Sequence, residues 1–182
     1  MVRKIILLLI LFLSTTACWY IGKTSEYGLP RRKIRPLPEN TDYSKIDTMA
    51  LYKLDSYYFY NSLEKKINDF TKKENDSYPY ISYLKFYSKG KLGLFVISKQ
   101  DTLNLQRCFF NPQKAKMGYY YIEGNKIKTK ISTIGNATLH ISRKKGFIYN
   151  DSIDIRHHNF YGNIFIKRNV PKELLEGWEP DW

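Results

Sequence analysis

The stretch Tyr119-Tyr-Tyr-Ile-Glu-Gly-Asn-Lys-Ile-Lys-Thr-Lys-Ile-Ser-Thr133 indicates the fold class more clearly than any other part of the chain. Apolar and polar positions alternate on both sides of Glu123-Gly-Asn125, which is the pattern of two β-strands joined by a tight turn. The same rhythm continues in the segments 137–141, 147–149, 152–155 and 163–166, each closed by Gly, Asn or Asp. Turn signals about every eight to twelve residues predict an antiparallel meander.

Strand patterns also occur upstream of this meander. Ser88-Lys-Gly-Lys91 lies between the apolar runs 80–87 and 92–97 and predicts a further hairpin. We also expect strands at Leu103–Phe110 and in the aromatic end of 43–60, one short amphipathic helix at Ser62–Lys73, and a helical turn at Pro171–Gly177. About seven or eight strands from Tyr80 onward must curl to bury one apolar face. The predicted fold is therefore mainly β, an antiparallel up-and-down barrel or half-barrel with one short helix.

The N-terminal residues have the pattern of a targeting signal. Arg3 and Lys4 precede an apolar run from Ile5 to Leu13, and small residues at 14–17 come directly before Cys18. A positive start, a short apolar run and small residues are typical of a secretory signal peptide. The run is shorter than the roughly twenty apolar residues that a membrane-spanning helix needs.

Cys18 gives this signal a more specific interpretation. Small residues followed by Cys resemble the lipobox of bacterial lipoproteins, although Thr15 stands where a lipobox typically has Leu. The resemblance implies that Cys18 is the lipid-attachment residue and that acyl chains hold the domain at a membrane. The alternative is an ordinary signal peptide cut near Ala17. The expected organisation is a lipoprotein signal peptide at 1–17, a lipidated Cys with an extended tether at 18–40, and a single β-rich domain at 41–182.

The chain is strongly basic, with a formal net charge of +13, or +11 once Arg3 and Lys4 are removed with the signal. Behind a signal peptide we expect no nucleic acid as a partner. The charge instead favours anionic lipid headgroups, lipopolysaccharide or acidic glycans, or a solvated basic surface with no partner. The basic run Arg31-Arg-Lys-Ile-Arg35 either touches such headgroups or belongs to a plain spacer.

Few residues have the arrangement of a catalytic or metal site. His157 and His158 are adjacent and would point to opposite faces of a strand, and His140, between two apolar residues, is expected to face outward. The sequence has no zinc-type ligand spacing, nucleophile elbow or phosphate-binding Gly loop. We therefore expect a non-enzymatic protein with no metal or cofactor, and a small hydrolase using His140 or His157 is the weaker alternative. Cys108 precedes two Phe residues and is expected to be a small buried apolar residue.

Aromatic residues are abundant, with 16 Tyr, 10 Phe and 3 Trp. Inward-facing rings on strands can line an apolar ligand pocket, whereas outward-facing rings beside Lys126, Lys128 and Lys130 can stack on sugars or lie among headgroups. Core packing is the alternative, because aromatic residues pack well in strands. The candidate ligand-binding residues are Tyr83, Phe86, Tyr120 and Tyr121.

The order of turns resembles that of the lipocalin-like domains of small envelope proteins. The resemblance rests on an aromatic strand ending in Gly90, on Tyr121-Ile-Glu-Gly-Asn-Lys-Ile127 and on Gly146-Phe-Ile-Tyr-Asn-Asp-Ser-Ile153; the chain lacks the Gly-x-Trp found near the N-terminus of true lipocalins. Together with Cys18, the chain is similar to small lipoproteins of Bacteroidota. In that group, residues after the Cys direct sorting. Trp19-Tyr-Ile-Gly-Lys23 has neither an Asp at the second position nor an acidic export run, which implies anchoring in the outer membrane, facing the periplasm.

The expected function is therefore that of a membrane-anchored, non-enzymatic module that binds a small apolar or amphipathic ligand, or a lipid. The alternative is a protein-interaction module, such as an envelope-assembly subunit or an immunity-type lipoprotein.

Overall fold

The structure of the chain is a computed structural model, which describes residues 22–32, 34, 42–60, 72–73, 78–135, 138–157 and 160–182. The predicted signal peptide, Cys18, His158 and all but the last two residues of the predicted helix at Ser62–Lys73 lie outside the described residues. Those last two residues form a short strand, β2 (Lys72–Lys73), which pairs with β1.

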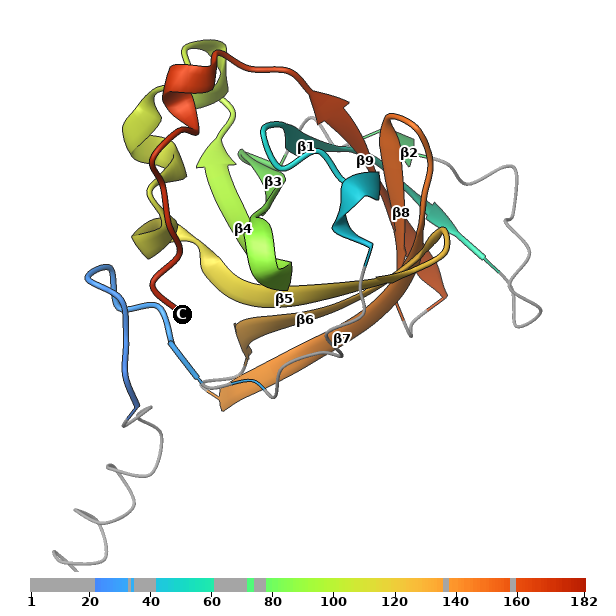
Figure 1. Cartoon of the computed structure of the whole chain (residues 1–182), viewed down its shortest axis with the longest axis horizontal. Coiled ribbons are helices and arrows are strands. Elements are labelled where there is room, and N and C mark those ends of the chain that lie inside the picture. The colour runs from blue at the N-terminus through green and yellow to red at the C-terminus, as the bar shows by residue number, and fades with distance from the viewer. Residues whose placement is uncertain are drawn as a thin grey trace, which may run out of the picture.

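Eight of the described strands close into an antiparallel barrel (Figure 1). They are β1 (Leu51–Phe59), β3 (Tyr80–Phe86), β4 (Lys91–Ser98), β5 (Lys116–Glu123), β6 (Lys126–Gly135), β7 (Thr138–Ile148), β8 (Ser152–Arg156) and β9 (Tyr161–Arg168). Each barrel strand pairs with the next one along the chain, and β1 pairs with β9 from Leu51 to Phe59. The prediction of a mainly β, up-and-down barrel is confirmed, and the barrel is closed.

All helical segments of the described residues are short 3-10 turns, and none is long and apolar enough to cross a membrane. The helical turn expected within Pro171–Gly177 is one of them. They are η1 (Tyr43–Lys45), η3 (Ser88–Gly90), η4 (Asp101–Leu103), η5 (Arg107–Phe110), η6 (Pro112–Lys114) and η7 (Lys172–Leu174).

The strand expected at Leu103–Phe110 is wrong, because this segment forms part of η4 and all of η5. Its backbone amides form hydrogen bonds with nearby residues; for example, the Asn104 amide donates to the Asp101 carbonyl oxygen. Its apolar side chains do not alternate between two faces, since the adjacent residues Phe109 and Phe110 pack in the same core cluster. Tertiary packing of Phe110 therefore overrides the local preference for a strand.

Cys108 lies in η5 and is exposed, so the expectation that it is buried is wrong. Its Sγ lies 3.6 Å from Gln106 Oε1. The turn that directs Phe110 into the core directs Cys108 to the solvent, since the two side chains leave one 3-10 turn at different points.

β7 is longer than the sequence pattern suggests. The segments 137–141 and 147–149 look like separate strands, whereas the structure has one continuous strand from Thr138 to Ile148. Gly146 is not a turn residue here. A Cβ added to it would lie 2.0 Å from the carbonyl oxygen of Asp154 on β8, so Gly146 permits a close approach of two strands.

A packed core lies inside the barrel. Phe86 and Tyr120, both 0% exposed, meet edge to face with ring centroids 4.9 Å apart, and Tyr120 Oη donates to the Tyr87 carbonyl oxygen. The other buried members of this cluster are Ile46, Tyr52, Leu84, Leu92, Ile122, Ile127, Ile131, Ile153, Ile155 and Phe165. A second cluster, which includes Tyr83, Phe95, Phe110 and Leu175, joins β3 and β4 to η5 and to the residues after β9.

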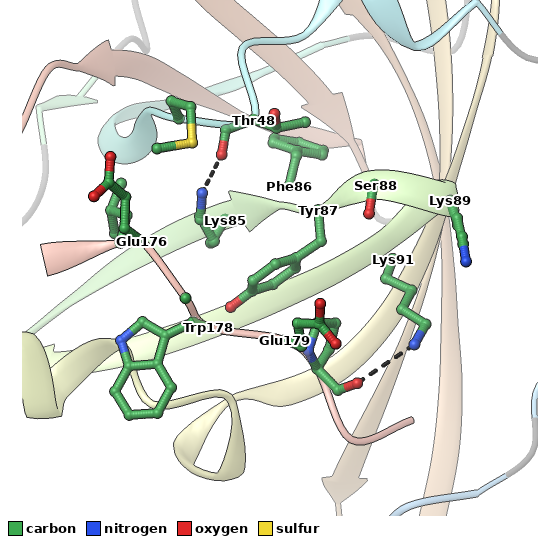
Figure 2. A pocket seen from close by; sticks show the side chains of 14 residues that line it. Thr48, Lys85, Phe86, Tyr87, Ser88, Lys89, Lys91, Glu176, Trp178 and Glu179 are labelled. Atoms are coloured by element: carbon green, nitrogen blue, oxygen red, sulfur yellow. Dashed lines mark hydrogen bonds between the residues drawn. The ribbon is translucent and has the colours of Figure 1, made fainter. Parts of the chain in front are cut away.

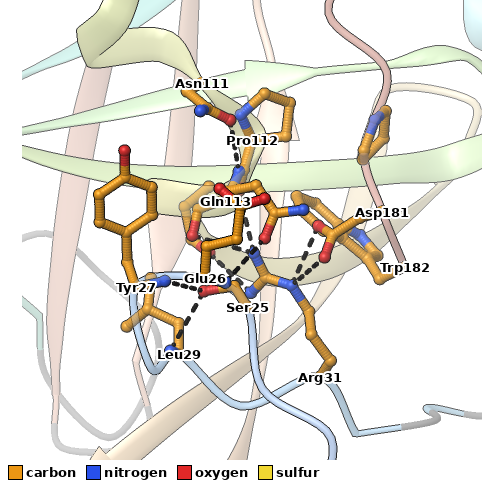
Figure 3. A network of polar contacts seen from close by, with 12 residues as sticks. Ser25, Glu26, Tyr27, Leu29, Arg31, Asn111, Pro112, Gln113, Asp181 and Trp182 are labelled. Carbon is orange, nitrogen blue, oxygen red and sulfur yellow. Dashed lines mark hydrogen bonds and ion pairs between the residues drawn. The ribbon is translucent and has the colours of Figure 1, made fainter.

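Residues 22–32 pack against the barrel instead of forming an extended tether (Figure 3). Thr24 and Pro30 form an isolated antiparallel bridge, and Arg31 is only 7% exposed. The Arg31 guanidinium pairs with the Asp181 carboxylate at 3.0 Å and donates to backbone carbonyls in and after η6. Arg31 is therefore buried and does not reach a headgroup layer, whereas its neighbour Arg32 is exposed.

Candidate anion-binding face

The four predicted ligand-binding residues do not line one cavity. Phe86 and Tyr120 lie together inside the barrel as core rings. Tyr83 belongs to the second cluster, where it contacts Phe110 at a centroid distance of 6.3 Å. Tyr121 is half-buried, with Lys128 Nζ 5.3 Å from its ring centroid. The structure thus brings Phe86 and Tyr120 together and leaves the other two apart; ligand binding by the four residues stays a prediction.

The outer surface of β6, β7 and β8 carries an unusual arrangement of charge. Ile127, Thr129 and Ile131 are 1–4% exposed and face the core, so the intervening lysines of β6 point outward. The strand register places Lys128 opposite Lys145, and Lys145 opposite Arg156. In the next outward-facing pair of the β6–β7 ladder, Lys130 lies opposite Arg143. We refer to Lys126, Lys128, Lys130, Arg143, Lys145 and Arg156 as the basic face.

Like charges directly opposite one another destabilise a sheet, each pair by a few tenths of a kcal/mol up to about 1 kcal/mol. The carboxylates that contact these cations are few among the described residues. Glu123 pairs with Lys128 at 3.2 Å, and both side chains are exposed, so this ion pair adds little stability. Asp154 lies 3.8 Å from Arg156 Nε. Two of these cations, Lys128 and Arg156, thus lie beside a described carboxylate.

Asp154 is shared with a buried tyrosine. Tyr58 Oη lies 2.6 and 2.7 Å from its two carboxylate oxygens. Burial raises the pKa of Tyr58, and the adjacent Asp154 carboxylate raises it further, so the hydroxyl remains a donor. Gly162 makes this contact possible, because a Cβ at that position would lie 2.4 Å from the Tyr58 ring. The Tyr58 hydroxyl therefore holds the Asp154 carboxylate beside Arg156.

A groove of about 460 Å³ lies on the basic face, and its lining combines cations with aromatic rings. Lys126, Lys128, Lys144, Lys145 and Arg156 supply positive charge to the lining, and Glu123 supplies negative charge. The Arg156 guanidinium lies 5.0 Å from the Phe147 ring centroid and 5.8 Å from that of Tyr60, and both rings line the groove. Guanidinium and ammonium groups beside rings form a surface suited to an anion with an attached apolar or sugar part.

The sequence indicated only part of this face. Lys126, Lys128 and Lys130 were expected to lie beside outward-facing rings, but Arg143, Lys145 and Arg156 were missed. The spacing of Arg143 and Lys145 places them on one side of a strand, which is a usable signal. Their position opposite the lysines of β6 depends on the register, and the sequence does not specify the register.

The predicted histidines lie apart from this arrangement or at its edge. His140 is exposed, as expected, and its Nε2 lies 2.6 Å from Thr138 Oγ1. His157 stacks on Tyr161 with ring centroids 4.0 Å apart. Across the ranges that the structure describes, no group of three or more His, Cys, Asp or Glu side chains is arranged to hold a metal ion.

Comparisons of the chain with protein-family models, with curated proteins and with solved structures found no match. Functional inference therefore depends on the geometry and charge of the basic face.

Proposed function

We propose that the protein is a non-enzymatic, lipid-anchored binding module of the bacterial envelope, and that its basic face binds the anionic headgroup of a phosphorylated lipid. The observation that supports this most directly is the pairing of like charges across β6, β7 and β8. An anion placed between such pairs removes their repulsion and gains charge-assisted hydrogen bonds.

The spacing of the cations suits phosphate groups. Neighbouring strands lie about 4.8 Å apart, so cations on adjacent strands can contact one phosphate together. Each Lys or Arg near an anionic membrane surface contributes about 1 kcal/mol to attraction. Phe147 and Tyr60, which line the same groove, can contact the glycerol or acyl region beside the headgroup.

Attachment at Cys18 would hold this face close to its ligand. The signal-like residues 1–17 and the Cys that follows support lipidation, and the sorting residues support an outer-membrane anchor that faces the periplasm. We expect Cys18→Ser to move the protein from the membrane fraction to the soluble fraction of expressing cells. A Cys18→Ser protein that stays fully membrane-bound would refute the anchor, and Cys108→Ser is the matched control.

The basic face can be tested with vesicles and the Cys18→Ser chain, in which no acyl chain contributes. We expect sedimentation with phosphatidylglycerol vesicles, release at high salt, and no binding to phosphatidylcholine vesicles. Lys128→Gln with Lys145→Gln should weaken binding by about 2 kcal/mol, or roughly thirtyfold. The same double variant should unfold at an equal or higher temperature, because it removes a like-charge pair.

Arg168→Gln with Lys172→Gln is the control, since both side chains are exposed and the net charge changes equally. Equal weakening by the two double variants would mean that net charge alone drives binding and that the basic face is not a site. Binding to both kinds of vesicle would likewise exclude headgroup recognition.

A protein partner is the second candidate. The buried core cluster inside the barrel favours it, because these side chains occupy space that a ligand-binding barrel would keep for its ligand. If the Cys18→Ser protein binds neither phosphatidylglycerol nor phosphatidylcholine vesicles, the result would favour a protein partner.

A further inference from the structure

A second pocket, of about 380 Å³, lies between the β3–η3–β4 turn and residues 175–180 near the C-terminus (Figure 2). None of its lining residues belongs to the basic face. The covering segment is held at both ends. Arg107 Nη2 donates to the Glu176 carbonyl oxygen at 2.9 Å, and Trp182 Nε1 donates to the Gly118 carbonyl oxygen at 3.1 Å. The pocket is therefore bounded by fixed elements.

Lys85 is the charged group deepest in this pocket, with an exposed fraction of 3%. Its Nζ donates to the Thr48 carbonyl oxygen and lies 5.4 Å from the Tyr87 ring centroid. No carboxylate of the described residues forms an ion pair with it. Asp47, which lies near, is paired with Lys167 at 2.9 Å. An ammonium has three N–H donors, so Lys85 has donors beyond the one that Thr48 uses.

Tyr87 also lines this pocket. It is 6% exposed, and its hydroxyl is buried without a hydrogen-bond partner among the described residues. Figure 2 shows its ring projecting from the end of β3 toward Trp178 in the covering segment. A buried hydroxyl with no partner is costly, and such groups in a folded protein need a physical explanation.

The remaining lining residues narrow the chemistry of a ligand. The lining includes Lys85, Lys89 and Lys91 together with Glu176 and Glu179, which leaves one net positive charge. That balance suits a monoanion better than a phosphate dianion. Met49 and Trp178 supply apolar surface in the same pocket.

We propose that this pocket binds a small organic carboxylate, whose oxygens accept hydrogen bonds from Tyr87 and pair with Lys85 while its hydrocarbon part contacts Trp178. The site is separate from the basic face and does not depend on headgroup binding. The recognised feature is a single carboxylate on an apolar chain.

The test is calorimetric titration of the full chain with octanoate, and with octan-1-ol as the uncharged probe of equal length. We expect saturable binding of one octanoate and binding of octan-1-ol that is at least about tenfold weaker. Tyr87→Phe removes only the hydroxyl and should weaken octanoate binding about tenfold. Without octanoate, its unfolding midpoint should not fall, because the lost hydroxyl has no hydrogen-bond partner among the described residues.

Three further variants locate the site. Lys85→Met should abolish octanoate binding, whereas Lys144→Met removes another partly buried lysine and should have no effect. Tyr149→Phe, at an exposed tyrosine, should also have none. The pair Lys128→Gln and Lys145→Gln should leave octanoate binding unchanged, and loss of binding in that pair would move the site to the basic face and overturn this assignment. The assignment of a carboxylate site to this pocket would also be overturned by any of three results. They are no octanoate binding, equal affinities for octanoate and octan-1-ol, and an unchanged octanoate affinity in Tyr87→Phe.

Discussion

At the residue scale, Arg31 connects three parts of the chain that are far apart in sequence. Its guanidinium pairs with Asp181, donates to the carbonyl oxygens of Pro112, Gln113 and Ala115, and lies 4.9 Å from the Trp182 ring centroid. The planar fork of an arginine is suited to such a set of acceptors. The sequence places Arg31 in a basic run beside prolines, and charge pattern alone does not distinguish a buried arginine from an exposed one.

Arg31→Met keeps much of the apolar stem but leaves these acceptors without their donor. Removing one partner of a buried ion pair costs roughly 3–5 kcal/mol, and we expect the lower end because Asp181 is 23% exposed. A loss of about 3 kcal/mol corresponds to a fall of roughly 6–12 °C in Tm for a chain of this size. Arg32→Met, at the exposed neighbouring residue, is the control and should change Tm by less than about 2 °C. Similar falls in both variants, measured by thermal unfolding, would show that Arg31 does not hold these segments together.

At the element scale, the structure agrees with the sequence wherever alternation and turn chemistry point the same way. The hairpin of β5 and β6 turns at Gly124 and Asn125, and Gly124 has a φ of 60°, which glycine adopts easily. Predictions failed where distant contacts decide the local structure. Leu103–Phe110 has apolar residues typical of a strand but turns so that Phe110 can join the second core cluster. Gly146 resembles a turn residue yet lies inside β7 against the backbone of β8.

The candidate sites show the same division at this scale. The lysines of β6 were recognisable from their spacing at every second residue, because strand periodicity is local. The basic face also needs the β6–β7 and β7–β8 registers, and the C-terminal pocket needs residues 175–180 to fold back over β3. Lys85 and Tyr87 lie two residues apart in an aromatic strand, and nothing in that pattern marks one as a buried cation and the other as an unpaired donor.

At the scale of the whole molecule, the balance of buried titratable groups determines how stability depends on pH. Burial lowers the pKa of Lys85 to about 8 from an ordinary value of 10.5, and burial together with nearby Lys116 lowers the pKa of Lys144 to about 8. Burial raises the pKa of Tyr87 and Tyr120 above the ordinary value of 10.0. As the pH rises through the alkaline range, the two lysines increase the free energy of unfolding and the two tyrosines decrease it.

We expect the unfolding temperature to rise between about pH 7.5 and 9.5 and to fall above about pH 10.5. Below pH 8 both lysines are charged in the folded and unfolded chain, and the folded state bears the cost of burying them. Between pH 8 and 10.5 the folded lysines have lost protons that the unfolded chain still binds, so stability increases with pH. Above pH 10 the unfolded tyrosines ionise while Tyr87 and Tyr120 keep their protons, so stability decreases.

Between pH 7.5 and 9.5, loss of the Lys85 proton in the folded chain should raise the free energy of unfolding by on the order of 2 kcal/mol, since one pKa unit corresponds to about 1.4 kcal/mol. Differential scanning calorimetry from pH 6 to 11 measures this profile, and Lys85→Met with Lys144→Met should remove its rising part. A stability maximum near pH 7 in the unmodified chain would mean that both lysines stay charged in the folded protein at pH 9, with solvent or a carboxylate close to each ammonium.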